Sequence, residues 1–310
     1  MPPDESNKMP KQKVFITGAG GMLGKAVYEV FSDEYEVIAT DIDLNEKWLE
    51  FMDVRDYNQC LKKISGFKPD MILHLAALTD LEYCENNPDD AWLTNALGTE
   101  NIALISKKTG ALMVYIGTAG IFDGKKEFYN DFDEPNPLSI YGKSKLHGEK
   151  ILPALLDRFF IFRAGWMIGG GQEKDKKFIN KIYKQIKSGK KELFVVDDKL
   201  GTPTYTYDFA RNMLRVVESG TYGLYNMVCN GSCSRYEVVE EFLKCLGLDG
   251  KIRIKKVSSD FFKKEYFAPR PYSEKLINFK LERRGMNFMR DWKICLNEYS
   301  KEFRDDLEIS

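Results

Sequence analysis

The stretch Lys13-Val-Phe-Ile-Thr-Gly18-Ala-Gly-Gly-Met-Leu-Gly24 decides the fold, because a short apolar run leads into a glycine-rich turn and then into a helical pattern. The apolar run is typical of a buried parallel strand. Gly18 permits a tight turn, Gly21 leaves room for a pyrophosphate beside backbone N–H groups, and Gly24 permits close helix–strand packing. Since the turn follows a strand and opens a helix, we expect it, with Met22 and Leu23, to bind a dinucleotide.

The rest of the first half alternates between strand and helix patterns. Strands are predicted at 13–17, 36–40, 71–75, 111–117 and 159–163, and helices at 22–31, 57–65, 88–107 and 139–156. This alternation predicts an α/β fold with a Rossmann-type doubly wound parallel sheet and right-handed crossovers.

Beyond residue 165 the pattern is less regular. Helices are expected at 174–187, 207–217, 234–246 and 290–303, with a strand at 193–196 and a turn at 201–204. We therefore predict an NAD-binding Rossmann domain and a smaller C-terminal substrate-binding lobe. The Rossmann domain covers 12–165, with 200–228 returning to it, and the lobe is made of 166–199 and 229–310.

Composition bounds the classes of partner. The chain has 310 residues, of which 43% are hydrophobic, and its 46 Lys and Arg nearly balance 47 Asp and Glu. That balance argues against a nucleic-acid partner, and no apolar run approaches the roughly 18 residues that a membrane span needs. Residues 1–11 are polar and lack an apolar signal core, so we expect a disordered lead-in and a cytoplasmic protein. Six scattered cysteines indicate reduced thiols, and two histidines argue against a zinc site, so no metal is predicted.

An acidic residue follows the second predicted strand at Asp41. An acid about 20 residues after the glycine turn accepts hydrogen bonds from the adenosine ribose in dinucleotide sites and repels a 2′-phosphate. Asp41 and Ile42 are therefore predicted to bind the cofactor, with NAD(H) preferred and NADP(H) possible. The alternative is that Asp41 only caps a turn.

Two further segments are placed at the cofactor by the predicted topology. Asp53 and Val54 are expected at the adenine edge, and Leu75-Ala76-Ala77 ends a strand with residues small enough for the cofactor to lie over the sheet edge. His74 lies inside the apolar strand before them. We interpret it as a hydrogen-bonded core residue and not as a base.

The proton-transfer group is predicted at Tyr141 and Lys145, which lie four residues apart on one helix face. A tyrosine has a pKa of about 10, and both the lysine ammonium and an oxidised nicotinamide favour the phenolate and lower that pKa. Lys145 is also placed to bond the nicotinamide ribose, and Thr118 to hold a substrate carbonyl. The pair Tyr183 and Lys187 has the same spacing, but we interpret it as the solvated face of a lysine-rich helix.

These motifs resemble the extended short-chain dehydrogenase/reductases, and within them the dTDP-4-dehydrorhamnose reductase (RmlD-like) branch of nucleotide-sugar reductases. The resemblance runs from about Val14 to Leu281. It rests on the glycine turn and on Ala76-Ala77 with Thr79-Asp80, Asn95-Ala96 with Gly98-Thr99, Thr118, Phe122-Asp123-Gly124, Tyr141-Gly142-Lys143-Ser144-Lys145 with Gly148-Glu149, Arg163 with Trp166, Gly201-Thr202-Pro203-Thr204 and Arg270-Pro271.

The resemblance implies an NAD(P)H-dependent reduction of a 4-keto-6-deoxy nucleotide sugar. Thr118, Tyr141 and Lys145 would be catalytic, and Thr79, Thr118, Trp166 and Arg270 would bind the substrate. Arg270 suits a diphosphate, because its guanidinium pairs with phosphate in bidentate fashion. A homodimer is a further expectation at this level.

Two alternatives stay open, and one departure from the family pattern leaves room for the second of them. After the strand, rhamnose reductases typically read Ser-Thr-Asp-Tyr, whereas this chain reads Gly117-Thr118-Ala119-Gly120. An epimerase would use the same catalytic residues. A non-catalytic dinucleotide-binding regulatory subunit, similar to the methionine adenosyltransferase accessory subunit, would keep the fold without turnover.

Overall fold

The computed structural model describes residues 11–304, so the lead-in expected at 1–11 lies, apart from Lys11, outside the described residues. A seven-stranded sheet in the order β11-β6-β5-β4-β1-β2-β3 forms its centre, and every pair in this sheet is parallel. Its strands are β1 (Lys13–Thr17), β2 (Glu36–Asp41), β3 (Leu49–Phe51), β4 (Met71–His74), β5 (Leu112–Thr118), β6 (Phe159–Ala164) and β11 (Gly223–Asn226). The predicted doubly wound sheet is confirmed.

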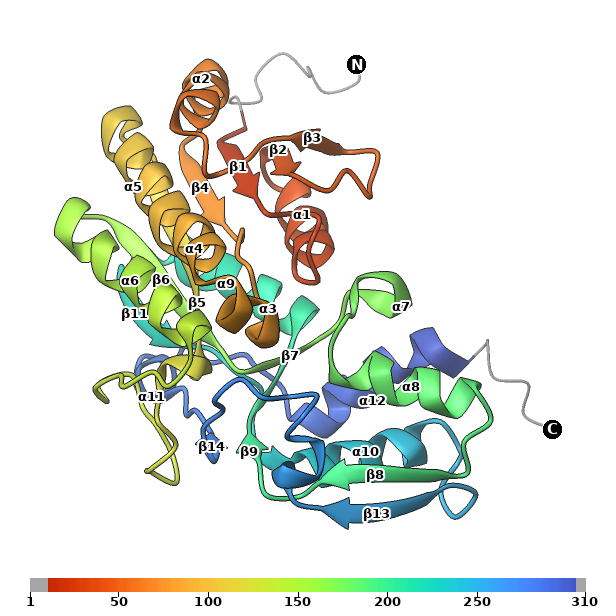
Figure 1. Ribbon diagram of the computed structural model, residues 1–310. Helices are drawn as coiled ribbons and strands as arrows, with labels where there is room; N and C mark the ends of the chain where they lie inside the picture. The colour runs from red at the N-terminus through yellow and green to blue at the C-terminus, as the bar shows by residue number, and fades with distance from the viewer. Residues whose placement is uncertain (1–10, 305–310) are drawn as a thin grey trace, which may run out of the picture.

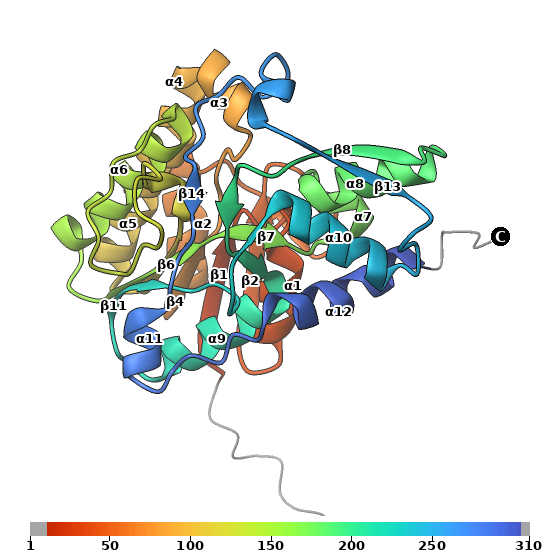
Figure 2. The ribbon, with the colours of Figure 1, turned by 90° about the horizontal axis from the view of Figure 1, so that it is seen from below.

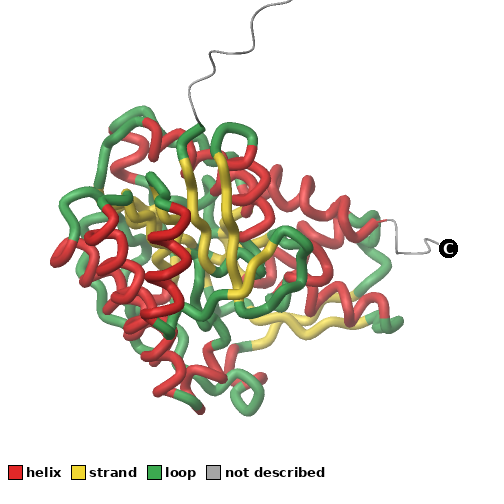
Figure 3. The backbone as a smooth tube through the Cα atoms, turned by 90° about the horizontal axis from the view of Figure 1, so that it is seen from above, coloured by secondary structure: helices red, strands yellow, loops and turns green. Residues whose placement is uncertain are grey.

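Helices cover both faces of the sheet (Figures 1 and 3). They are α1 (Gly24–Ser32), α2 (Tyr57–Phe67), α3 (Leu81–Asn86), α4 (Pro88–Ala91), the π-helical segment η2 (Trp92–Leu97), α5 (Gly98–Thr109), the 3-10 turn η3 (Ala119–Ile121), α6 (Ile140–Leu155) and α9 (Thr206–Glu218). Alternate residues of β1 enter two cores: Val14 and Ile16 pack in the core that holds α1 and α9, and Phe15 in the core that holds α2, α5 and α6.

The strand order reverses between β1 and β4, which lie side by side while their connections run to opposite sides. In doubly wound sheets, ligands bind outside the carboxyl ends of the strands at such a switch point. Gly18 and Leu75 follow these two strands, so the predicted cofactor residues stand at the expected place.

The remaining elements form a lobe beside the carboxyl edge of the sheet, with α10 and α12 packed together and β8 paired with β13 (Figures 1 and 2). They are β7 (Trp166–Ile168), α7 (Gly171–Lys174), α8 (Phe178–Lys187), β8 (Glu192–Val196), β9 (Leu200–Gly201), β10 (Pro203–Tyr205), β12 (Cys233–Ser234), α10 (Arg235–Cys245), β13 (Arg253–Val257), η4 (Ser259–Phe262), β14 (Ser273–Glu274) and α12 (Trp292–Arg304), whereas α11 (Phe279–Arg283) packs against β11. Within residues 11–304, no helix is long and apolar enough to cross a bilayer.

Two helix predictions need correction. The single helix expected at 88–107 is α4, η2 and α5 in succession, because a π turn shifts the hydrogen-bond pattern at residues 92–97. The helix expected at 174–187 is divided by the buried Asp175, which accepts a hydrogen bond from Tyr299. Tyr183 is wrongly placed on a solvated face, since its ring is buried against Phe303.

Several short strands escaped the sequence patterns. β3, β7, β11 and β13 have three to five residues. β3 pairs with the nearby β2, whereas β7, β11 and β13 pair with strands that are distant in sequence. β13 contains Arg253, Lys255 and Lys256, which give it no apolar run, yet it pairs in parallel along the whole of β8. Strand formation here depends on tertiary pairing, which local propensity does not encode.

Candidate active site

One cavity of about 1790 Å³ opens between the carboxyl edge of the sheet and the lobe. Its volume exceeds the roughly 300–1,000 Å³ of a site for one small molecule, so it has room for a dinucleotide and a second ligand. All the cofactor, catalytic and substrate residues predicted from the sequence line it: Gly18, Gly21, Met22, Leu23, Asp41, Ile42, Asp53, Val54, Leu75, Ala76, Ala77, Thr79, Thr118, Tyr141, Lys145, Trp166 and Arg270.

The glycines of the turn differ in how much space surrounds the position of a Cβ atom. Gly18 has a φ of 73°, and a Cβ on it would lie 2.2 Å from the backbone nitrogen of Ala76. A Cβ on Gly24 would lie 1.9 Å from the carbonyl oxygen of Ala19. Gly21 is different, because the nearest atom to its Cβ position is the Gly18 oxygen at 3.5 Å. The protein's own packing therefore requires Gly18 and Gly24, whereas the space at Gly21 belongs to the cavity and fits the approach of a pyrophosphate.

The Asp41 carboxylate stands at the end of β2 and lines the cavity. It accepts a hydrogen bond from the Gly20 backbone N–H at 2.8 Å and another from the Asp43 N–H at 2.9 Å. The turn-capping role left open by the sequence is therefore real. Because each carboxylate oxygen has more than one lone pair, this role is compatible with further hydrogen bonds from a ribose.

A cation missed by the sequence reasoning lies at the predicted adenine edge. Arg55 lines the cavity and forms a two-pronged pair with Asp53, with nitrogen–oxygen distances of 2.7 and 3.0 Å. The Arg55 guanidinium lowers the pKa of Asp53 by hydrogen bonding. Asp53 is thus held in place by its own neighbour two residues along the chain.

Close packing of α6 on β5 and η3 positions the predicted proton-transfer group. A Cβ on Gly142 would lie 2.4 Å from the Gly120 oxygen, and one on Gly148 would lie 2.7 Å from the Tyr115 hydroxyl. That hydroxyl donates to the Lys145 carbonyl at 2.9 Å. Glycine at two points on one face therefore lets α6 approach the end of β5, which places Tyr141 beside Thr118 in the cavity.

The predicted lowering of the tyrosine pKa is wrong for the protein by itself. Burial raises the pKa of Tyr141 to about 12, and the hydrogen bond with Thr118 opposes this rise. Burial also lowers the pKa of Lys145 to about 7, against the attraction of Glu149. The Lys145 amine lies 4.1 Å from the centroid of the Tyr115 ring. Desolvation outweighs the mutual effect of the pair, which sequence spacing does not reveal.

Buried polar side chains form hydrogen bonds that hold β4 and the segment after it in place. His74 is 1% exposed and bonds the hydroxyls of Thr17 at 2.7 Å and Thr99 at 3.0 Å. Burial lowers the pKa of His74 to about 3, which agrees with its interpretation as a core residue. The side chain of Asn95 bonds both backbone groups of Leu78, at 2.8 and 3.0 Å, and so fixes the segment after β4.

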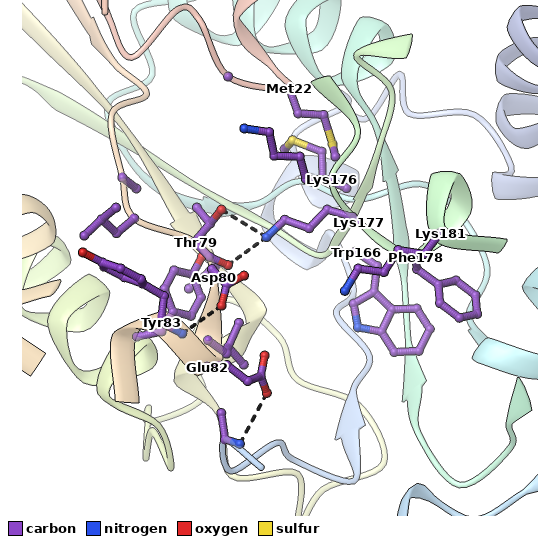
Figure 4. Close-up of a pocket in the computed structure, with 18 of the residues that line it drawn as sticks. Met22, Thr79, Asp80, Glu82, Tyr83, Trp166, Lys176, Lys177, Phe178 and Lys181 are labelled. Atoms are coloured by element: carbon purple, nitrogen blue, oxygen red, sulfur yellow. Dashed lines mark hydrogen bonds between the residues drawn. The ribbon is translucent and has the colours of Figure 1, made fainter. Parts of the chain in front are cut away.

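The lobe contributes side chains that reach across the cavity (Figure 4). The Lys177 amine donates to the Thr79 carbonyl at 2.8 Å and to its hydroxyl at 3.1 Å. Arg270, predicted to meet a substrate diphosphate, instead forms a two-pronged pair with Glu82 of α3, with distances of 2.6 and 2.8 Å. Both contacts join the lobe to the loop and helix that follow β4.

Sequence reasoning missed Lys177, Arg235 and Glu274, although all three line the cavity. Arg235 stacks on Trp166 with 3.6 Å between the guanidinium carbon and the ring centroid, and Glu274 accepts the Trp166 indole N–H at 2.7 Å. The one local signal was the lysine run near residue 176, which could have been linked to an anionic ligand.

A doubly wound parallel sheet with a glycine turn, a tyrosine–lysine pair on α6 and a second lobe over its carboxyl edge defines the class of extended short-chain dehydrogenase/reductases. The model of the RmlD substrate binding domain matches residues 12–305, and the chain belongs to this family.

Relatives cover nearly the full length of the chain. The spore coat polysaccharide biosynthesis protein SpsK of Bacillus subtilis is 33% identical over 94% of this chain and 97% of its own. Methionine adenosyltransferase 2 subunit beta of Xenopus tropicalis is 25% identical over 94% of this chain and 87% of its own. The crystal structure of dTDP-4-dehydrorhamnose reductase from Bacillus anthracis in complex with NADP has a TM-score of 0.85 and 30% identity, and covers 94% of this chain and 99% of that one.

Proposed function

We propose that this protein, an NAD(P)-dependent oxidoreductase of the short-chain dehydrogenase/reductase type, reduces the ketone of a 4-keto-6-deoxy nucleotide sugar. The observation that carries the proposal is that Thr118 and Tyr141 are neighbours in the same cavity as the glycine turn. Two adjacent hydroxyls beside a dinucleotide site suit the carbonyl oxygen of a substrate.

A nicotinamide dinucleotide fits the residues present. The open space at Gly21 lies at the start of α1, where the helix dipole favours a pyrophosphate. When bound, the reduced cofactor supplies a hydride to the carbonyl carbon. Thr118 orients the carbonyl, and Tyr141 transfers its hydroxyl proton to the oxygen. Lys145 holds the nicotinamide ribose and, beside Tyr141, stabilises the phenolate that remains.

The acidic residues at the end of β2 support a cofactor preference. Asp41 and Asp43 line the cavity at and just beyond the end of β2, where dinucleotide folds bind the adenosine ribose, and Asp41 accepts the Gly20 N–H at 2.8 Å. Like charges repel, so we propose that NAD(H) is preferred over NADP(H). Equal or better turnover with NADPH would contradict this preference.

A second candidate function is regulation without turnover. It is favoured by Ala119 and Gly120, which replace the acid and the aromatic residue of the rhamnose-reductase pattern, and by the similarity to methionine adenosyltransferase 2 subunit beta. Intact Thr118, Tyr141 and Lys145 favour the enzyme.

One panel separates these functions. The purified chain is mixed with NADH or NADPH and dTDP- or UDP-linked 4-keto-6-deoxy sugars, and loss of the reduced-nicotinamide absorbance is followed. Net consumption with formation of an alcohol supports the reductase. Interconversion of sugar epimers without net consumption would assign an epimerase, and tight cofactor binding with no change in any sugar would assign a regulatory subunit.

A further inference from the structure

A carboxylate that the family pattern does not predict stands at the sugar end of the cavity. Glu274 lies in β14, which pairs with β9 through Ser273↔Leu200 and Glu274↔Gly201. Gly201 in turn lies directly against the Trp166 ring, since a Cβ there would be 2.2 Å from the ring atom Cε2. The backbone of Glu274 is therefore fixed by a small sheet that packs on Trp166.

The side chain of Glu274 is fixed as well. Its Oε2 accepts the indole N–H of Trp166 at 2.7 Å. One face of the indole carries the Arg235 guanidinium at 3.6 Å from the ring centroid, and this cation attracts Glu274. An anchored indole and a nearby cation leave the carboxylate few alternative positions, which is a requirement for a recognition residue.

The second oxygen of Glu274 lies near Thr118 and the Tyr141 ring, beside Gly120. A Cβ added to Gly120 would lie 3.5 Å from Thr118 Oγ1, 3.5 Å from Tyr141 Cε1 and 3.7 Å from Glu274 Oε1. The carboxylate and the catalytic pair can approach each other here because position 120 has no side chain, whereas rhamnose reductases typically carry an aromatic residue there.

A ketone held by Thr118 and Tyr141 places the neighbouring ring carbons in the part of the cavity that Glu274 also lines. In a 4-keto-6-deoxy sugar, carbon 5 carries a methyl group and carbon 3 carries a hydroxyl. A carboxylate is an acceptor only, and a hydrogen bond to a charged group is worth more than a neutral one. We propose that Glu274 Oε1 accepts a hydrogen bond from the hydroxyl next to the reacting ketone. The chain then selects sugars that carry a free hydroxyl at this carbon over their deoxy analogues.

This inference rests on the proposed function for the identity of the substrate, but its test measures binding and not turnover. The ligands are a dTDP-linked 6-deoxyhexose, which is the alcohol product, and its 3-deoxy counterpart. Each is titrated into the wild-type chain in the presence of NAD⁺ and followed by calorimetry. We expect the wild type to bind the hydroxyl-bearing ligand at least about 10-fold more tightly, since a hydrogen bond to a charged group contributes about 1.5–3 kcal/mol.

The variant Glu274→Gln keeps an oxygen for the Trp166 indole and removes the charge. It should bind both ligands with nearly equal affinity, and at the affinity that the wild type has for the deoxy ligand. Glu265→Gln, which changes another carboxylate of the cavity lining, is the matched control and should keep the wild-type preference. Gly120→Val provides a second route, because its side chain would stand between the Glu274 carboxylate and the pair Thr118 and Tyr141.

The outcomes distinguish a Glu274 that binds the sugar hydroxyl from a Glu274 that only positions Trp166. If Glu274→Gln weakens both ligands by the same factor, Glu274 only positions Trp166 and the inference is wrong. A wild-type chain that binds the two ligands equally, or binds neither, also overturns it. A chain that discriminates between them but shows no ketone reduction keeps this inference and removes the proposed reductase activity.

Discussion

The two sides of the cavity are built in different ways. The sheet side is made mainly of backbone and small residues. A Cβ on Gly18 would lie 2.2 Å from the Ala76 backbone, and one on Gly24 would lie 1.9 Å from the Ala19 backbone. The lobe side is made of long charged side chains, such as Lys177 and Arg270, that reach across to Thr79 and Glu82.

This difference indicates a division of labour. On the proposed function, a rigid backbone cradle would recognise the part of a ligand that is the same in every dinucleotide. Long side chains on a separate lobe would adjust to a variable sugar and its diphosphate by exchanging ion-pair partners. Tyr141 and Thr118 lie where the two sides meet. The following changes test the division, from the largest expected effect to the smallest.

Tyr141→Phe should reduce turnover by about 10²–10⁴-fold, because the proton donor to the carbonyl oxygen is lost. Cofactor affinity should stay within about twofold of the wild type, since the sheet side is unchanged. Steady-state absorbance assays and cofactor titrations measure the two effects. Tyr183→Phe is the control, because Tyr183 has the same spacing from a lysine but is buried in the lobe core. A Tyr141→Phe enzyme that works at the wild-type rate would remove Tyr141 as the acid.

Substitutions in the glycine turn should separate folding from binding. Gly24→Ala should lower the free energy of unfolding by about 3 kcal/mol, because its Cβ would lie 1.9 Å from the Ala19 oxygen. Gly21→Val should leave that free energy within about 0.5 kcal/mol and lower cofactor affinity at least about 10-fold. Urea unfolding and cofactor titration measure these quantities.

The control for the glycine series is Gly66→Ala. Gly66 lies in α2 with no atom within 4 Å of its Cβ position, so alanine should stabilise the helix by about 0.5–1 kcal/mol. Tight cofactor binding by Gly21→Val would show that the pyrophosphate does not approach this turn.

Lys145→Met should stabilise the folded chain by about 1–3 kcal/mol at pH 7 while turnover is lost, because a cation that is 4% exposed is removed. Burial lowers the pKa of Lys145 from 10.5 to about 7, so the unfolded chain binds more protons between these two pH values. The cost of burying Lys145 is fully present below pH 7 and decreases as the pH rises towards 10.5.

The increase in the free energy of unfolding that Lys145→Met causes, measured by urea unfolding, should therefore become smaller from pH 7 to pH 9. Lys143→Met on the exposed face of the same helix is the control and should give no such trend. An increase in the free energy of unfolding that is the same at pH 7 and pH 9 would contradict the lowered pKa of the buried Lys145 amine.

Glu82→Gln should have the smallest effect. The Glu82 and Arg270 side chains are 20% and 29% exposed, so the free energy of unfolding should change by about 1 kcal/mol or less. The freed guanidinium should bind dTDP a few-fold more tightly, while Arg270→Gln should weaken dTDP binding about 10-fold. Calorimetry measures both, and equal affinities in the two variants would show that the diphosphate lies elsewhere.

Sequence predicts the sheet side far better than the lobe side, for a physical reason. Gly18, Asp41 and Tyr141 follow strands or begin helices, so a local pattern together with the parallel topology already places them at one edge. Glu274 and Gly120 are 154 residues apart along the chain, and their approach depends on strands of two residues, β9 and β14, which have no local signal.

The ionisation of the site was also beyond the sequence. The spacing of Tyr141 and Lys145 suggests mutual activation, but burial dominates both pKa values, and burial is a property of the folded chain. The lysines near residue 176 are another case: their line-up along the cavity comes from the break between α7 and α8 at Asp175.

The central claim is that a hydride reaches a sugar ketone while Tyr141 supplies the proton. Its most direct test is to incubate the chain with NADH deuterated at the transferable C4 position and a dTDP-linked 4-keto-6-deoxy sugar, and to analyse the sugar by mass spectrometry and NMR. We predict one deuterium on carbon 4 of an alcohol product with the wild type and essentially none with Tyr141→Phe. An unchanged ketone with all deuterium still on the cofactor would contradict the account.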